Sequence, residues 1–333
     1  MKRRLPAFAT LAAVGLLALT AAFLAGAVLS SRQLLVDRSR AETLLDTRSA
    51  AWETVGKLNT ALQETWNADA QTLDAWWINH APSFPTGSAL LSLSSRINLN
   101  SITPFLLQDS ELIGTLLGKS VEDFTTYRAN NGPFVALDEY KDYFQPEALN
   151  TLYCAHSFFN ANTADEIMLE KILTLRTGDA TFASTVRASV REFRTNRRIM
   201  AQSDLDALIG GEKEAVGDLL TINPELDVNT VSPAVLLAIL RDPDWKLDQP
   251  DAKLQVLMAG RASKPWAPET LQQALGVDTN SPLLQYLGTR CRFLQGSVPA
   301  GSAVLTFIMT VDYSTDSPPK LTLRILQTYW TTA

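Results

Sequence analysis

The sequence lacks the residue patterns on which most enzymes depend. Only two histidines, His80 and His156, occur in 333 residues, and neither stands at a metal-ligand spacing from other ligand residues. There is no glycine-rich phosphate loop, no nucleophile elbow and no Cys-x-x-Cys pair. We therefore expect a protein that is not an enzyme, with no catalytic, cofactor-binding or metal-binding residues and no cofactor.

Two clusters of acidic residues are the strongest candidates for a catalytic site. They are Asp138 with Glu139, and Asp204 with Asp206. Each stands where a helix is expected to begin, and carboxylates stabilise exposed helix N-termini, so this explanation is preferred to a catalytic one. Calcium could bind the oxygen-rich loops that begin at Asp242 and Asp312, but neither loop has a ligand spacing that defines a site.

Positive charge and cysteine are also scarce. The chain has 29 lysines and arginines against 35 acidic residues, a net charge of −6, so it offers no basic field for nucleic acid. Cys154 and Cys291 are its two cysteines, each placed near the end of a repeat. In an oxidising compartment they could form a disulfide, and two unpaired buried thiols are the alternative.

The N-terminus carries a long uncharged run. Lys2, Arg3 and Arg4 precede the stretch 5–29, which contains no charged residue. A bilayer-spanning helix needs about 20 apolar residues, and basic residues mark its cytoplasmic side. We therefore predict a single transmembrane helix within 1–29, with the bulk of the chain exported. The small residues of 25–27 leave a cleaved signal peptide as the alternative.

The helix is predicted to continue beyond the membrane. Apolar residues recur at steps of three and four, with charged residues on the other faces. They are Leu45, Trp52, Val55, Leu58, Leu62 and Trp66. Gly56 is the only glycine or proline between residues 30 and 64. We expect one long helix whose second half packs on the soluble body through this stripe.

Three asparagines introduce similar helix start signals. The segments are Asn100-Ser101-Ile102-Thr103-Pro104, Asn162-Thr163-Ala164-Asp165-Glu166 and Asn229-Thr230-Val231-Ser232-Pro233. Thr103, Asp165 and Ser232 are suited to cap a helix, and proline or glutamate is suited to its first position. A short extended run precedes each asparagine, at 96–99, 158–161 and 225–228.

The similarity extends beyond the caps. Each copy later has an arginine followed by a bulky apolar residue, the pairs being Arg128 with Phe134, Arg194 with Met200, and Arg261 with Trp266. The arginines are 66 and 67 residues apart, and a second helix signal follows each, near 138, 203 and 268. We interpret this as an internal repeat of small helical units. The alternative is that helices of similar length simply begin alike.

The C-terminal stretch predicts strands. The runs 291–297, 304–311 and 321–330 are rich in β-branched and aromatic residues and are separated by turn residues, which indicates three antiparallel strands. The run 89–93 and residues 96–98 could join the same sheet. The helical repeats would then be an insertion in a sheet-and-helix body, and the two flanks would have to meet in space.

These features together resemble the K-type minor pseudopilins of the type II (general) secretion pathway. The segment 96–100 resembles the family's entry into a helical insert, 227–230 its second asparagine-rich strand, and Gly132-Pro133-Phe134 with Asp138-Glu139 the hairpin between them. The segment 287–298 resembles the return to the sheet. The resemblance implies an α+β fold: a transmembrane helix (1–29), a pilin-like stalk helix and first strands (30–97), an inserted all-α repeat domain (98–288) and closing antiparallel strands (289–333).

The resemblance also implies a function. Such a subunit lies in the inner membrane with its bulk in the periplasm, joins other minor pseudopilins and the secretion platform in a hetero-oligomer, and caps a short filament that supports protein export. Two features that pseudopilins normally have at the N-terminus are missing here. The glycine that normally precedes the apolar run is missing, since the first glycine is Gly15 inside it. The glutamate five residues into most mature pseudopilins is also missing, as it is in the K type.

A membrane-anchored DNA-uptake protein is the alternative function. Strand-then-helix units also occur in helix-hairpin-helix modules, which grip phosphates with hairpin amides. Such hairpins have two glycines around a small apolar residue, and the turns at 128–133 and 261–265 lack that pair. The acidic charge balance also argues against it.

Overall fold

The structure is a computed structural model. It describes residues 30, 33, 37–39, 41–63, 88–196, 199, 201–243, 247–313 and 321–332. The chain divides into two compact units, 1–56 and 57–333. It is an α+β protein with a long N-terminal helix over 37–63, a four-stranded antiparallel sheet and many helices. The predicted fold class is confirmed at this level.

The N-terminal helix buries only part of the predicted stripe. Val55, Leu58 and Leu62 are buried, but Leu45 is 65% exposed and Trp52 is 43% exposed. The buried face also includes Ala51, because positions 51, 55, 58 and 62 share one side of a helix with about 3.6 residues per turn, whereas 45 and 52 lie about a quarter-turn away. The expectation that Leu45 and Trp52 belong to the buried stripe is wrong.

The predicted membrane segment, 5–29, and Trp66 lie outside the described residues. Among the helices that the structure does describe, none combines the length and the apolar character needed to span a bilayer.

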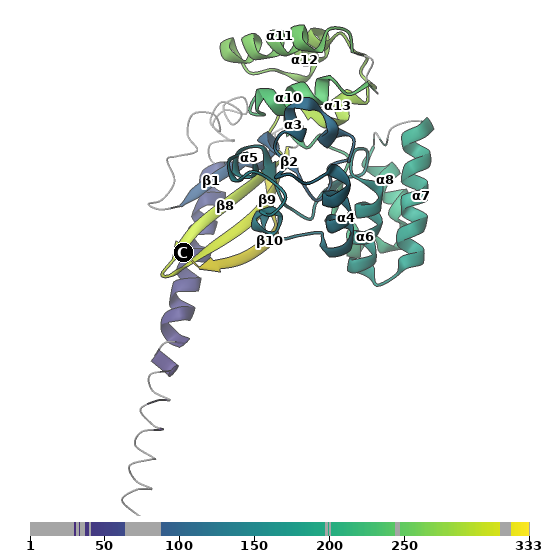
Figure 1. Ribbon diagram of the computed structural model, residues 1–333. Helices are drawn as coiled ribbons and strands as arrows, with labels where there is room; N and C mark the ends of the chain where they lie inside the picture. Colours follow the sequence, from purple (N-terminus) through teal and green to yellow (C-terminus); the bar gives the residue numbers. More distant parts are fainter. Residues whose placement is uncertain are drawn as a thin grey trace, which may run out of the picture. The chain divides into compact units, whose positions relative to one another are not determined.

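The sheet joins the two ends of the 57–333 unit. Its order is β1 (Ala89–Ser92), β8 (Phe293–Ala300), β9 (Ala303–Tyr313) and β10 (Leu321–Thr332), all antiparallel (Figure 1). Leu91 pairs with Gln295, and Ser92 pairs with Leu294. The three predicted C-terminal strands and the pairing of the flanks are therefore confirmed. The chain from 93 to 292 leaves the sheet and returns to it.

The two faces of the sheet differ. One face, with Phe293 and Ile308, forms a small core with Leu93, Cys154 and Phe158. The other face is apolar and buried along the central strands, at Leu294, Leu305, Phe307, Met309 and Val311. Gly296 permits this packing, because a Cβ there would come within 1.9 Å of Phe307 Cζ.

Three two-stranded parallel ladders organise the chain between β1 and β8. The pairs are β2 (Ile97–Asn98) with β3 (Tyr153–Cys154), β4 (Phe159–Asn160) with β5 (Leu220–Thr221), and β6 (Leu226–Asp227) with β7 (Leu287–Gly288). We call the enclosed segments copy one (97–154), copy two (159–221) and copy three (226–288). The repeated ladders agree with the predicted internal repeat. The expectation that the inserted segment is all-α is wrong, because each copy contains a parallel ladder of two short strands. The expectation that residues 96–98 join the main sheet is wrong, since β2 pairs with β3 instead.

Short helices fill each copy, and the 3-10 helix η1 (Leu93–Ser95) leads from β1 to β2. Copy one contains η2 (Leu106–Gln108), α3 (Ser110–Ile113), α4 (Val121–Asn131), η3 (Leu137–Tyr140) and α5 (Pro146–Leu152). Copy two contains α6 (Glu166–Thr177), α7 (Ala180–Asn196), α8 (Gln202–Ile209), η4 (Gly210–Glu212) and α9 (Lys213–Val216). Copy three contains α10 (Pro233–Leu240), α11 (Pro250–Ser263), α12 (Pro268–Leu275) and α13 (Leu283–Tyr286).

Two of the three predicted caps are confirmed. Asp165 accepts hydrogen bonds from the first-turn amides of α6, and Ser232 accepts one from the third residue of α10. Thr103 caps no helix. Asp109 instead caps the short helix α3, accepting from the amide of Glu111. The first helix of copy one is the 3-10 helix η2, and its N-cap position is held by Phe105 rather than Thr103.

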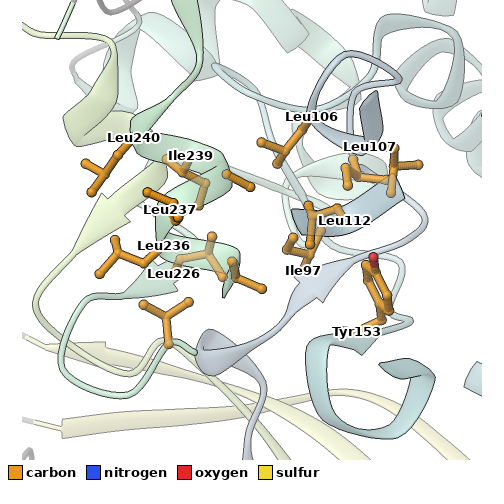
Figure 2. Close-up of a cluster of buried hydrophobic side chains, with 14 of the residues drawn as sticks. Ile97, Leu106, Leu107, Leu112, Tyr153, Leu226, Leu236, Leu237, Ile239 and Leu240 are labelled. Carbon is orange, nitrogen blue, oxygen red and sulfur yellow. The ribbon is translucent and has the colours of Figure 1, made fainter. Parts of the chain in front are cut away.

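The copies do not have equal cores. Copies one and three share a single apolar core, in which Ile97, Leu112 and Tyr153 of copy one lie with Leu226, Leu236 and Leu240 of copy three (Figure 2). Copy two has its own core, built on Leu169, Leu173, Val186, Val190 and Leu205. The first and third copies are therefore one structural block, although copy two separates them in sequence.

Candidate functional site at the junction of the copies

Each copy is closed by an asparagine that holds a distant backbone segment. Asn100 Oδ1 accepts from the amide of Phe134 at 2.9 Å, and its Nδ2 donates to the carbonyl of the same residue at 2.8 Å. The equivalent pairs are Asn162 with Ile199 and Asn229 with Trp266. The expected apolar partner in copy two was Met200, but the residue at that position is Ile199.

The side-chain oxygens of these asparagines accept hydrogen bonds from the backbone amides of the turn. The alternative DNA-binding interpretation needs free hairpin amides to hold phosphates. Because the amides of Phe134, Ile199 and Trp266 already donate to asparagine oxygens, they are not available for that role.

The repeated arginine holds the other side of the same loop. Arg128 Nη1 donates to the carbonyls of Leu99 at 3.0 Å and Ile102 at 2.6 Å. Arg261 does the same with Val228 and Val231, and Arg194 Nε donates to Ala161 at 3.0 Å. Burial lowers the pKa of Arg128. The regular arginine spacing in the sequence therefore reflects a structural role rather than a binding surface.

Copies one and two are joined by a buried ion pair. Arg128 Nη2 lies 3.2 Å from Asp165 Oδ2, and both side chains are nearly inaccessible to solvent. The amide of Asp165 also donates to the carbonyl of Ser101 at 2.8 Å. The residue that caps α6 thus also connects two copies.

Copies two and three meet at Gln285, near the end of copy three. Its carbonyl accepts from Asn160 Nδ2 at 3.1 Å, and its side-chain oxygen accepts from Asn162 Nδ2 at 2.9 Å. Asn160 and Asn162 therefore organise the loop of their own copy and bind the next. The sequence pattern gave no sign of Gln285, because it has no equivalent in the asparagine motif.

Glu225, the residue just before copy three, contacts the other two copies. It stands just before β6 of copy three, and its Oε1 accepts from the amide of Asn160 in copy two at 2.9 Å. Its Oε2 accepts from Ser101 Oγ in copy one at 3.4 Å. Burial raises the pKa of Glu225 to about 7, with these two hydrogen bonds acting in the opposite direction. A cavity of only 30 Å³ lies beside it, so the site is too small for a ligand larger than water.

His156 connects copy one to the sheet. Asn98 Nδ2 lies 3.1 Å from His156 Nδ1 and donates to the carbonyls of His156 and Phe158. The His156 ring stacks on Phe293 of β8, with the ring centroids 5.1 Å apart. Burial lowers the pKa of His156 to about 4, so the ring is neutral at physiological pH. It serves as a buried hydrogen-bonding group.

The remaining sequence candidates fall into ordinary structural positions. Asp138 and Glu139 lie in the first turn of η3, and Asp204 lies in the first turn of α8. Cys154 and Cys291 are both buried free thiols, so the structure has no disulfide between them. Within the ranges that the structure describes, no three His, Cys, Asp or Glu side chains gather in a way that could hold a metal ion.

One apolar surface is exposed on the N-terminal helix. Leu45 and Trp52 lie one heptad apart on the same side, with Leu44 49% exposed nearby. Their charged neighbours include Arg38 and Glu42, which form an exposed ion pair. A pair of large apolar side chains at heptad spacing is suited to packing against another helix. We call Leu45 and Trp52 the exposed helix stripe.

Comparison with protein-family models and with curated proteins finds no match to this chain.

Proposed function

We propose that this protein is a structural minor pseudopilin of a type II secretion system, anchored in the inner membrane with its bulk in the periplasm. The observation that carries the proposal is the pairing of β1 with β8, because it inserts the three helical copies into one antiparallel sheet. A long helix precedes that sheet in the chain. This combination is what the family resemblance implies.

The exposed helix stripe supports a role in assembly. Leu45 and Trp52 are large and apolar yet exposed, so they are available to pack on the helix of a neighbouring subunit. The expected partners are other minor pseudopilins and the secretion platform. The helical copies between β1 and β8 add bulk to one subunit, which would prevent a further subunit from adding above it.

Deletion and complementation test this function. Deleting the gene should abolish export of secreted enzymes and leave their synthesis intact. Complementation with Leu45→Asp/Trp52→Asp should fail, although the protein accumulates normally. Ala50→Asp is the matched control, since Ala50 is exposed on the same helix but lies well over a quarter-turn from both Leu45 and Trp52. Unaffected export in the deletion strain would refute the proposal.

The N-terminus provides an independent test. Mass spectrometry of the membrane-extracted protein should find Met1 intact, which means an unprocessed anchor, or a start at Phe8 with a methylated amine, which means pseudopilin processing despite the missing glycine. A start at Val28 would mean a cleaved signal peptide and would contradict a retained membrane anchor.

A further inference from the structure

A cavity of 310 Å³ lies between the sheet and copy two. One wall is the face of the sheet that carries Phe293. The other wall comes from copy two and the loop that follows it, and includes Gln202, Thr221 and Asn223. Pockets that hold small molecules begin at about 300 Å³. The cavity is therefore large enough for one small ligand.

The register of the strands gathers polar side chains on the sheet wall of this cavity. Thr310 of β9 pairs with Phe293 of β8 on one side and with Arg324 of β10 on the other. Asp312 of β9 pairs with Thr322 of β10 in the next row of the same face. Paired residues of an antiparallel sheet point to one face, and so do residues two apart on a strand. These five side chains therefore share a face, and all of them line the cavity.

The polar groups of this wall are unused. Thr310 is 4% exposed, and its hydroxyl makes no hydrogen bond to any described residue. A change of χ1 rotamer that turns this hydroxyl into the cavity therefore breaks no hydrogen bond. Arg292 also lines the cavity but already has an interaction of its own. The side chains of Asp312, Thr322 and Arg324, in contrast, make no hydrogen bond or ion pair with a described residue, so they are available to a ligand.

This combination of groups favours a neutral ligand with several hydroxyls. An anion would be repelled by Asp312, and a cation would be repelled by Arg324. A ligand hydroxyl can donate to a carboxylate and accept from a guanidinium, and it can do either with a threonine hydroxyl. Phe158 and Phe293 supply an apolar part of the wall, which suits the C–H groups of a sugar ring.

We propose that this cavity binds one pyranose ring of a neutral glycan, with ring hydroxyls hydrogen-bonded to Asp312, Arg324 and Thr310. An amino-acid zwitterion could satisfy the two charged side chains. It has no hydroxyls for the neutral groups of Thr310 and Thr322, which a sugar provides. The inference does not depend on the proposed function, because it uses only the sheet and copy two.

Saturation-transfer NMR on the full-length protein tests the proposal. The detergent must contain no sugar, so lauryldimethylamine oxide is used in place of a maltoside. The probes are the methyl glycosides of glucose, galactose, mannose and N-acetylglucosamine. At least one of them should bind saturably, with a Kd of about 1 mM or tighter. Raising the salt concentration about tenfold should leave that Kd unchanged, because salt does not screen the binding of a neutral ligand.

Three variants assign the binding to this cavity. Arg324→Met and Asp312→Asn change exposed side chains, so the fold should persist, and each should weaken binding about tenfold or more. Thr310→Val removes the unpaired hydroxyl without adding bulk and should also weaken binding. Thr328→Val is its control, because Thr328 is exposed on β10 and pairs with Phe307 on the opposite face. Lys264→Met, an exposed change in copy three, is the control for the loss of charge and should change nothing.

Three results would overturn the proposal. The first is that no glycoside shows saturable binding up to about 100 mM. The second is tighter binding of acetate, methylammonium or glycine than of every glycoside, because the site would then select a charged ligand. The third is glycoside binding that is unchanged in both Arg324→Met and Asp312→Asn, because the sugar would then bind elsewhere on the protein.

Discussion

The packing of Trp266 depends on the absence of a side chain at Gly260. A Cβ at this position of α11 would lie 2.0 Å from Cζ2 of Trp266, whose indole Nε1 donates to the carbonyl of Leu257 at 2.9 Å. We expect Gly260→Ala to lower the free energy of unfolding by about 1–3 kcal/mol, because overpacking outweighs the gain of about 1 kcal/mol in helix propensity. Urea denaturation measures this. Gly56→Ala, where no atom lies within 4 Å, is the control and should stabilise the protein slightly.

Glu225 is expected to make stability depend on pH. Its pKa is raised from 4.5 to about 7, so the folded state favours the protonated carboxyl. The resulting stability is fully present below pH 4.5 and is lost as pH rises through 7. Glu225→Gln should remove this dependence. The difference in unfolding free energy between wild type and variant, measured by urea denaturation from pH 4.5 to 7.5, should shift by roughly 1–3 kcal/mol in favour of the variant as pH rises.

His156 should change the free energy of unfolding with pH in the opposite direction, over nearly the same pH range. Its pKa is lowered from 6.5 to about 4, so its contribution is present above pH 6.5 and is lost as pH falls through 4. A His156→Gln protein should therefore gain stability relative to wild type on acidification, measured by the same urea titrations. If the two variants showed slopes of the same sign, at least one of the buried environments would be wrongly described.

At the level of single elements, the N-terminal helix offers a matched pair of substitutions. Leu58 is 1% exposed and Leu45 is 65% exposed on the same helix. We expect Leu58→Asp to destabilise the 57–333 unit by several kcal/mol, because a carboxylate would be buried without a partner. Leu45→Asp should change thermal stability little. Circular dichroism melting compares the two, and equal melting temperatures would contradict the assignment of the buried face.

Strong local signals predicted elements well. Runs rich in β-branched and aromatic residues, separated by turn residues, identified β8, β9 and β10. The capping residues Asp165 and Ser232 marked the starts of α6 and α10. Both signals act within a few residues, which is why they can be read directly from sequence. Thr103 failed because no helix starts directly after it. Copy one begins with the 3-10 helix η2, whose N-cap position is Phe105, and its first α-helix starts only after Asp109.

Non-local contacts were harder to predict. The ladder of β2 with β3 is two residues long, so it has no periodicity that could distinguish it from a strand of the main sheet. The side of the N-terminal helix that is buried depends on what it packs against, and Leu45 and Trp52 fit the spacing rule as well as Ala51 does. Glu225 begins the extended run 225–228, but Arg96 and Phe158 stand at the equivalent positions of the other runs, so its residue type is not repeated. Gln285 lies outside the repeated motif. Neither residue therefore carried a signal, although both join the copies.

At the scale of the whole molecule, the copies that are adjacent in the chain are not the ones that share a core. Copies one and three share one apolar core, while copy two, which separates them in sequence, has its own. Copy two is held to its neighbours mainly by polar contacts, including the ion pair of Arg128 with Asp165 and the hydrogen bonds to Gln285. Such an arrangement favours two cooperative units, because apolar burial is the larger source of cooperativity.

Hydrogen exchange can test this division. Leu173 of copy two and Leu236 of copy three are both fully buried, and truncating a buried leucine costs about 2–5 kcal/mol. Leu173→Ala should raise amide exchange throughout copy two and leave the other copies protected. Leu236→Ala should raise exchange in copies one and three together. Leu175→Ala, on the same helix as Leu173 but 65% exposed, is the control. If either buried substitution raised exchange equally in all three copies, they would form one cooperative unit, and the polar junction around Glu225 and Gln285 would have to bind as tightly as the apolar cores.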